Sequence, residues 1–183
     1  MIAQPARRDF NDVNDQSTHT DLAPDLRISR VVTGLWQIAD MERDRQSLDL
    51  DRAAQSMKAY TDAGLTSFDM ADHYGPAEEI VGAFLQKQRE GGGGPAQVFT
   101  KWVPEPGEID QTTVRRAVER SLTRLKSEKI DLLQFHWWDF SVPGFVETAH
   151  WLDELRQAGK IRQPLAQAIE MRQSAGDPDL FRW

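Results

Sequence analysis

The stretch FDMADHYG, residues 68–75, places several titratable side chains at the end of a short apolar run. It contains Asp69 and Tyr74, while Lys101 and His136 end two later apolar runs. A tyrosine is a weak acid with a pKa of about 10, which a nearby cation lowers by stabilising the phenolate. A lysine held by a carboxylate supplies such a cation, and a neutral histidine can orient a carbonyl oxygen. These residues therefore predict a site that moves a proton onto an oxygen, with any hydride coming from a cofactor.

Four β-rich apolar runs alternate with segments of helical apolar spacing. The runs predict strands, near residues 31–36, 66–70, 97–101 and 130–136. The residues that mark the strand ends are separated by 35, 32 and 35 positions: Gly34, Asp69, Lys101 and His136. This near-constant period predicts repeated βα units and a parallel sheet.

Two architectures share this pattern, the doubly wound sheet and the (β/α)₈ barrel. No G-x-G-x-x-G follows the first predicted strand, and the GGGG run at 91–94 precedes a strand, as a linker would. We therefore expect part of a (β/α)₈ TIM barrel, about four βα units with parallel strands and outer helices. In such a barrel the carboxyl ends of the strands carry the chemistry, which would bring the four polar groups to one mouth.

Composition narrows the class of protein further. The chain of 183 residues has no cysteine, which rules out disulfides and thiolate metal sites and favours a cytoplasmic location. A net charge of −7 opposes nonspecific nucleic-acid binding. No apolar run is long enough to cross a membrane, and the first twenty residues do not resemble a secretory signal.

Each candidate residue also has a simpler explanation when it is taken alone. Asp69 and Asp72 are suitable caps for the helix that follows, and a lone tyrosine such as Tyr74 is more often a packing residue. Lys101 near a strand end is usually solvated, and His136 next to Trp137 and Trp138 suits an aromatic cluster. The set as a whole favours chemistry over these separate readings.

Metal-assisted hydrolysis is a second chemical reading, because metallohydrolases also use βα barrels. Asp72, His73 and His136 would be its ligands. Such enzymes usually carry His-x-His on the first strand, and this strand reads VVTGLW, so we expect no metal site.

Five motifs together resemble the aldo-keto reductase superfamily. They occur in family order from about residue 27 to 162: VVTGLWQ, GLTSFDMADHYG, VFTKW, RSLTRLKSEKIDLLQFHW and LDELRQAGKIR. The resemblance implies a (β/α)₈ barrel that reduces aldehydes and ketones to alcohols with NADP(H). It also implies that Tyr74 is the general acid, that Lys101 and Asp69 tune its pKa, and that His136 orients the substrate.

The same resemblance implies the surroundings of the two ligands. The cofactor-binding residues would be Gly34, Trp36, Gln37 and Asp69, and the substrate pocket would be lined by Trp36, Trp102 and Trp137. The substrate is expected to be a small carbonyl compound. Its identity and the choice between NADP and NAD stay open.

The resemblance divides the chain into three parts. We expect a flexible arm over 1–25, an aldo-keto reductase-like half barrel over 26–162 and a divergent tail over 163–183. Pro164 lacks the N–H that a fifth strand would use, and the tail from Leu165 to Arg172 has the spacing of a short helix. Strands five to eight, and with them most of the cofactor site, are expected to be missing.

Two functions follow from this division. One is an NAD(P)H-dependent aldo-keto reductase. The alternative is a catalytically inactive fragment that acts, if at all, as an interaction or regulatory protein. The open edges of a half barrel are expected to favour self-association. A gene-model truncation, a splice variant and a decayed duplicate would share these features.

Overall fold

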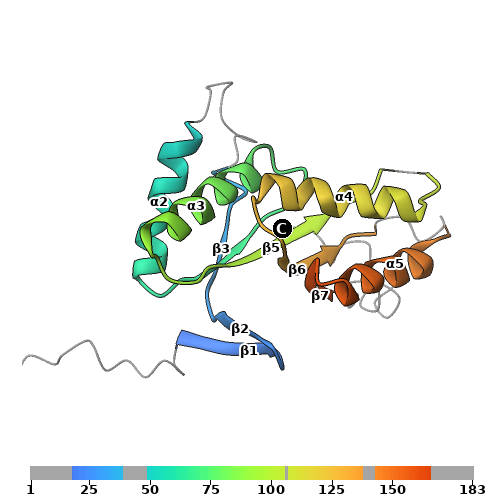
Figure 1. Ribbon diagram of the computed structural model, residues 1–183, viewed down its shortest axis with the longest axis horizontal. Helices are drawn as coiled ribbons and strands as arrows, with labels where there is room; N and C mark the ends of the chain where they lie inside the picture. The colour runs from blue at the N-terminus through green and yellow to red at the C-terminus, as the bar shows by residue number, and fades with distance from the viewer. Residues whose placement is uncertain (1–17, 39–48, 106, 138–142, 166–183) are drawn as a thin grey trace, which may run out of the picture.

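The computed structural model describes residues 18–38, 49–105, 107–137 and 143–165. Its strands alternate with helices after an N-terminal hairpin (Figure 1). The hairpin consists of β1 (His19–Ala23) and β2 (Leu26–Ser29). The sheet strands are β3 (Val32–Gly34), β4 (Ser67–Asp69), β5 (Gln97–Trp102), β6 (Ile130–Phe135) and β7 (Ile161–Leu165). The helices are α2 (Leu50–Asp62), α3 (Ala77–Gly91), α4 (Gln111–Arg124) and α5 (Phe145–Gln157).

The five sheet strands are parallel and lie in chain order, β3-β4-β5-β6-β7. Gly34 pairs with Asp69, Asp69 with Phe99, and Trp102 with Phe135. The four strands and the parallel pairing that the period of 32 to 35 residues predicts are confirmed. Because parallel strands align their carboxyl ends, residues 69, 101 and 136 follow one edge of the sheet.

A fifth strand corrects the expectation that strand pairing stops before residue 163. β7 pairs with β6, and Pro164 lies opposite Leu133. Within the described residues β7 has one strand neighbour, so only one side of it needs ladder hydrogen bonds. A proline is tolerated in such an edge strand. Leu165 is part of the strand, and the rest of the expected short helix lies outside the described residues.

The hairpin corrects the expected arm over residues 1–25. Residues 1–17 lie outside the described residues, but His19–Ala23 pairs antiparallel with Leu26–Ser29. β2 buries Leu26 and Ile28 in a small cluster with Phe99 and Leu132 of the sheet. β1 is polar because most of it faces solvent, which is why its sequence lacks the apolar run of a typical strand.

The other face of the sheet packs against helices. One cluster joins strand residues such as Phe68, Val98 and Leu133 to the apolar stripes of α3 and α4. Helix α4 is capped by Asp110, whose carboxylate accepts a hydrogen bond from the Thr113 amide at 2.7 Å. None of the described helices is long and apolar enough to cross a bilayer.

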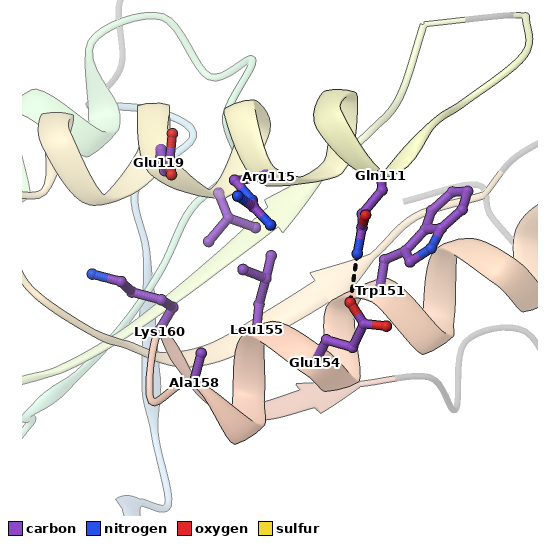
Figure 2. A pocket seen from close by; sticks show the side chains of 9 residues that line it. Gln111, Arg115, Glu119, Trp151, Glu154, Leu155, Ala158 and Lys160 are labelled. Carbon is purple, nitrogen blue, oxygen red and sulfur yellow. Dashed lines mark hydrogen bonds between the residues drawn. The ribbon is translucent and has the colours of Figure 1, made fainter.

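Helices α4 and α5 pack beside each other and leave a hollow of about 270 Å³ between them (Figure 2). Gln111 donates a hydrogen bond across it to Glu154 at 2.6 Å, and Trp151 and Leu155 line the α5 side. None of the residues that the sequence indicates for chemistry lines this hollow.

Candidate active site

Lys101 and Asp69 form an ion pair near the carboxyl edge of the sheet. The Lys101 ammonium donates to Asp69 Oδ2 at 2.5 Å and to the Met70 carbonyl at 3.0 Å. Their side chains are 18% and 28% exposed, so both still reach solvent. The expected contact between these two residues is therefore confirmed, and it joins two neighbouring strands.

Gln134 is a third member of this cluster, and sequence reasoning missed it. Its amide nitrogen donates to Asp69 Oδ1 at 2.8 Å, so both carboxylate oxygens of Asp69 are occupied. The available signal was a polar residue inside the otherwise apolar run LLQF, in register with Lys101 on the next strand.

Tyr74 lies next to the Asp69, Lys101 and Gln134 cluster, in the turn between β4 and α3. Its ring meets the Trp36 ring edge-on at 4.5 Å and the His73 ring at 4.9 Å between centroids. The Lys101 ammonium is 5.3 Å from the centre of the Tyr74 ring. The Tyr74 amide donates to the Ala71 carbonyl at 3.1 Å, which closes a tight turn that presents the side chain. The structure thus brings Asp69, Tyr74 and Lys101 together.

The pKa of Tyr74 is raised above 10.0 by partial burial and by the negative charge of Asp69. The sequence predicted the opposite direction, from the neighbouring ammonium. The reason for the difference is geometric, because the ammonium bonds Asp69 and the Met70 carbonyl and faces the Tyr74 ring. Tyr74 therefore keeps its proton at neutral pH, as a proton donor must.

His136 directly follows β6, and its amide donates to the Trp102 carbonyl at 3.0 Å. Its backbone therefore continues the sheet pairing at the carboxyl edge, and its side chain is half-buried. The substrate-orienting role of His136 stays a prediction.

Three tryptophans were expected to line the substrate pocket, and they lie in two different settings. Trp102 and Trp137 are 4% and 7% exposed, and both pack on Phe135 with ring centres 5.6 Å away. Both belong to the core cluster that includes the helices, although Trp102 also lines a surface hollow of about 550 Å³. Trp36 is half-buried and touches Tyr74. A pocket role for all three stays a prediction.

The expected nicotinamide end of the cofactor site is open. Gly34 and Gln37 are exposed, and a Cβ at Gly34 would have no atom within 4 Å. The Leu35 amide donates to the Asp69 carbonyl at 2.9 Å, which holds this segment beside Asp69. The cofactor-binding residues predicted from the resemblance, Gly34, Trp36, Gln37 and Asp69, include no lysine or arginine that could bind the cofactor's phosphates.

Asp72 has partners that differ from both of its sequence-based alternatives. Its carboxylate is bound by Arg120 at 2.9 Å and by His73 at 3.2 Å. The N-cap of α3 is Pro76, and no side-chain hydrogen bond among the described residues caps this helix. The interpretation of Asp69 and Asp72 as caps of this helix is therefore wrong. Nor do the described residues contain any group of three or more His, Asp or Glu placed to hold a metal ion.

A parallel sheet in chain order, helices on one face and polar groups at the carboxyl edge define the βα-barrel class of proteins. The match of a family profile over residues 30–164 then places the chain more narrowly: it belongs to the Aldo/keto reductase family.

Two similar proteins are named as an aldo-keto reductase and a methylglyoxal reductase. An aldo-keto reductase of Bacillus subtilis, YhdN, is 32% identical over 143 residues, which cover 75% of this chain and 42% of that protein. Methylglyoxal reductase YeaE of Escherichia coli is 29% identical over 141 residues, covering 76% of this chain and 45% of that protein. The chain spans less than half the length of these relatives.

Solved structures agree with this assignment. A glycerol dehydrogenase from Gluconobacter oxydans matches with a TM-score of 0.65 and 32% identity, over 87% of this chain and 53% of that one. An aldo-keto reductase from Klebsiella pneumoniae in complex with NADPH matches with a TM-score of 0.60 and 25% identity, over 75% and 45%. The fold is therefore the corresponding part of an aldo-keto reductase barrel.

Proposed function

We propose that this chain carries the acid-catalytic side of an NADP(H)-dependent carbonyl reductase site. The observation that carries the proposal is the Lys101–Asp69 pair, with Nζ and Oδ2 2.5 Å apart, beside the half-buried Tyr74. The family of the chain supports the reaction class, because aldo-keto reductases reduce carbonyl groups with NAD(P)H.

In the proposed reaction Tyr74 donates its hydroxyl proton to the carbonyl oxygen of a small aldehyde or ketone. NADP(H), when bound, supplies the hydride. Lys101 offsets the charge that develops on the phenolate, while Asp69 and Gln134 hold the ammonium in position. His136 donates a hydrogen bond that orients the carbonyl, and Trp36 covers the side of the reacting centre nearest Tyr74.

The chain by itself is proposed to bind the cofactor weakly. Binding energy from remote parts of a cofactor normally helps to orient the reacting atoms. Positioning the reactants can lower the activation barrier by about 7–11 kcal/mol. General acid catalysis raises the rate roughly 10²–10⁴-fold, which is a smaller effect. The proposed cofactor-binding residues Gly34, Trp36, Gln37 and Asp69 would hold only one end of the cofactor. We therefore expect the chain of 183 residues to show little or no reduction of carbonyl substrates.

The test uses the chain alone and a chimaera. In the chimaera, residues 18–165 replace the matching segment of YhdN, which supplies the remaining length. Reduction of methylglyoxal is followed by NADPH absorbance. We expect the chimaera to turn over, and Tyr74→Phe to lower its rate by about 10²–10⁴-fold. Tyr60→Phe is the matched control and should leave the rate unchanged. A folded chimaera whose activity does not depend on Tyr74 would refute the proposal.

A second candidate function is a non-catalytic interaction or regulatory protein, favoured by the open edge of the sheet. β3 is an edge strand of the described sheet. Val31, just before it, and Val32, its first residue, are 59% and 38% exposed. An exposed apolar edge strand favours pairing with another chain. Light scattering of the purified chain together with NADPH fluorescence titration separates the two candidates. A monomer that binds NADPH would argue against the second.

A further inference from the structure

A second group of ionic contacts lies on the helix side of the sheet, behind residues 70–76, which we call the Tyr74 turn. Arg124 of α4 donates to the Asp72 carbonyl at 3.0 Å and to Glu78 Oε2 at 3.2 Å. Its Nε also lies 3.3 Å from Glu79 Oε1. One guanidinium therefore holds both the turn before Tyr74 and the first turn of α3.

Glu78 extends this contact to the strand that carries Lys101. Its side chain is 1% exposed, and Oε1 accepts a hydrogen bond from the Thr100 hydroxyl at 2.8 Å. Thr100 is fully buried and points away from the side of β5 that carries Lys101, because successive strand residues face opposite sides. The buried carboxylate thus links α3, α4 and β5 next to the candidate acid.

Asp72, two residues before Tyr74, is held at three points. Its carboxylate is bound by Arg120 at 2.9 Å and its carbonyl by Arg124 at 3.0 Å. Its amide donates to the Lys101 carbonyl at 2.9 Å. The Asp72 side chain is only 7% exposed, so its anchoring charge is largely removed from water.

The position of Arg124 is fixed by close backbone packing. A Cβ added to Gly82 of α3 would lie 2.1 Å from the Arg124 carbonyl oxygen. The two helices therefore touch at Gly82, one turn after Glu78, and the reach of Arg124 toward the Tyr74 turn is set by that contact.

We infer that Arg120 and Arg124 are positioning residues that hold the Tyr74 turn, residues 70–76, against the strand that carries Lys101. We call these two residues the arginine clamp. The inference rests on the proposed function for its purpose, but its geometry stands on the contacts alone. The clamp acts through Asp72 and Glu78.

A merely structural role for these arginines predicts a different result. Ordinary packing residues would lower the free energy of unfolding and leave the surroundings of Tyr74 in the folded state unchanged. The clamp predicts that its loss frees Tyr74 within a folded chain. Tyr74 then becomes more hydrated and moves away from Asp69, so its pKa falls toward 10.0.

The chain permits a direct measurement because it has two tyrosines, Tyr60 and Tyr74. In a Tyr60→Phe background, the ultraviolet absorbance of the phenolate reports Tyr74 alone. The charged or titratable neighbours of its ring are Asp69, Lys101 and His73, which are the same in every variant. Deuterium exchange of the Tyr74 amide near neutral pH gives a second readout, independent of alkaline conditions.

The variants are Arg124→Lys, which keeps the charge but loses the fork of contacts, and Arg120→Gln. Arg116→Gln is the matched control, an exposed arginine one turn earlier on α4. Circular dichroism establishes that each variant is folded. Arg120 is about half exposed, so its variant is expected to fold even if Arg124→Lys does not.

We expect the Tyr74 hydroxyl to titrate at a lower pH in both clamp variants than in the parent. Deuterium exchange at the Tyr74 amide should be faster in both. Arg116→Gln should match the parent in both measurements. Folded Arg120→Gln with parental titration and exchange would overturn the inference. An equal change in Arg116→Gln would overturn it as well. Neither readout requires NADPH or turnover. The result of this test therefore does not depend on whether the proposed reductase activity is found.

Discussion

The two ends of the sheet each carry a carboxylate paired with a cation. At the carboxyl edge Asp69 pairs with Lys101 at 2.5 Å. Near the amino edge Asp131 lies 3.4 Å from Arg162 and accepts the Val98 amide at 3.0 Å. The Asp131 and Arg162 side chains are 14% and 30% exposed, similar to the other pair. Burial and charge alone therefore do not distinguish a candidate site from a structural contact.

The difference lies in what surrounds each pair. The amino end is closed by the hairpin, where Gln163 binds Asp25 at 2.6 Å and Leu26 packs against the inner face of the sheet. The carboxyl end carries Tyr74, Trp36 and an open Gly34. In βα barrels the first kind of end serves stability and the second serves chemistry. Substitutions at the two ends should separate these properties.

The largest effect on stability is expected at the closed end. Leu26 is fully buried, and Leu26→Ala should lower the free energy of unfolding by about 2–5 kcal/mol. The titration of Tyr74 should not change. Urea unfolding measures the first, and phenolate absorbance in a Tyr60→Phe background measures the second. Leu22→Ala on the same hairpin, where Leu22 is 47% exposed, is the control and should cost little.

Lys101→Met should have a smaller effect on stability and a specific effect on the site. We expect a loss of about 1–2 kcal/mol, because the pair is partly exposed and Gln134 still binds Asp69. The pKa of Tyr74 should rise further, since the charge of Asp69 is no longer offset. A lower pKa in this variant would contradict the placement of Lys101. The control is Lys58→Met, which removes an exposed pair on α2.

The closed end also predicts a dependence on pH. Burial raises the pKa of Asp131 above its ordinary 3.8, so the folded state binds this proton more tightly than the unfolded state. Its contribution to stability is present below pH 3.8 and is lost as the pH rises through the raised pKa. Asp131→Asn cannot lose a proton and still offers an oxygen to the Val98 amide.

Asp131→Asn should therefore gain stability relative to the parent between about pH 3 and pH 7, by about 1 kcal/mol or less. Urea unfolding at both pH values measures this difference. The same comparison with Asp62→Asn, an exposed member of an ion pair, is the control. A relative stability that stays constant or falls with pH would contradict the assigned cause.

The smallest expected effect concerns activity. In the isolated chain Tyr74→Phe should leave the rate of NADPH-dependent reduction essentially unchanged, because the cofactor is not held well enough for acid catalysis to matter. The measurement is NADPH consumption with a simple aldehyde. Turnover that disappears with Tyr74→Phe would mean that the chain holds the cofactor itself, or does so after self-association.

The regular part of the fold was predictable because its signals are local. Apolar runs at a nearly constant spacing predicted strands near residues 97–101 and 130–136, where β5 and β6 lie. The hairpin and β7 were missed because their pairing depends on position. A solvent-facing strand such as β1 needs no apolar run, and an edge strand can contain Pro164.

The candidate site was predictable to the extent that residue type determines contacts. The pairing of Asp69 with Lys101 follows from opposite charges at adjacent strand ends. The contribution of Gln134 and the raised pKa of Tyr74 depend on side-chain geometry, which spacing does not specify. The burial of Trp102 and Trp137 depends on Phe135, between them along the chain, which packs against both rings.

The strand order of the sheet has a consequence for how the chain folds during synthesis. Each strand from β4 to β7 pairs with the strand made immediately before it, and among the described residues every such pairing closes a segment with one helix. Such pairings have short sequence separations, which favour fast folding. We expect β3 to β6 to assemble in the order in which they leave the ribosome. The Tyr74 turn would then meet Lys101 as soon as β5 emerges, before α4 can supply its arginines.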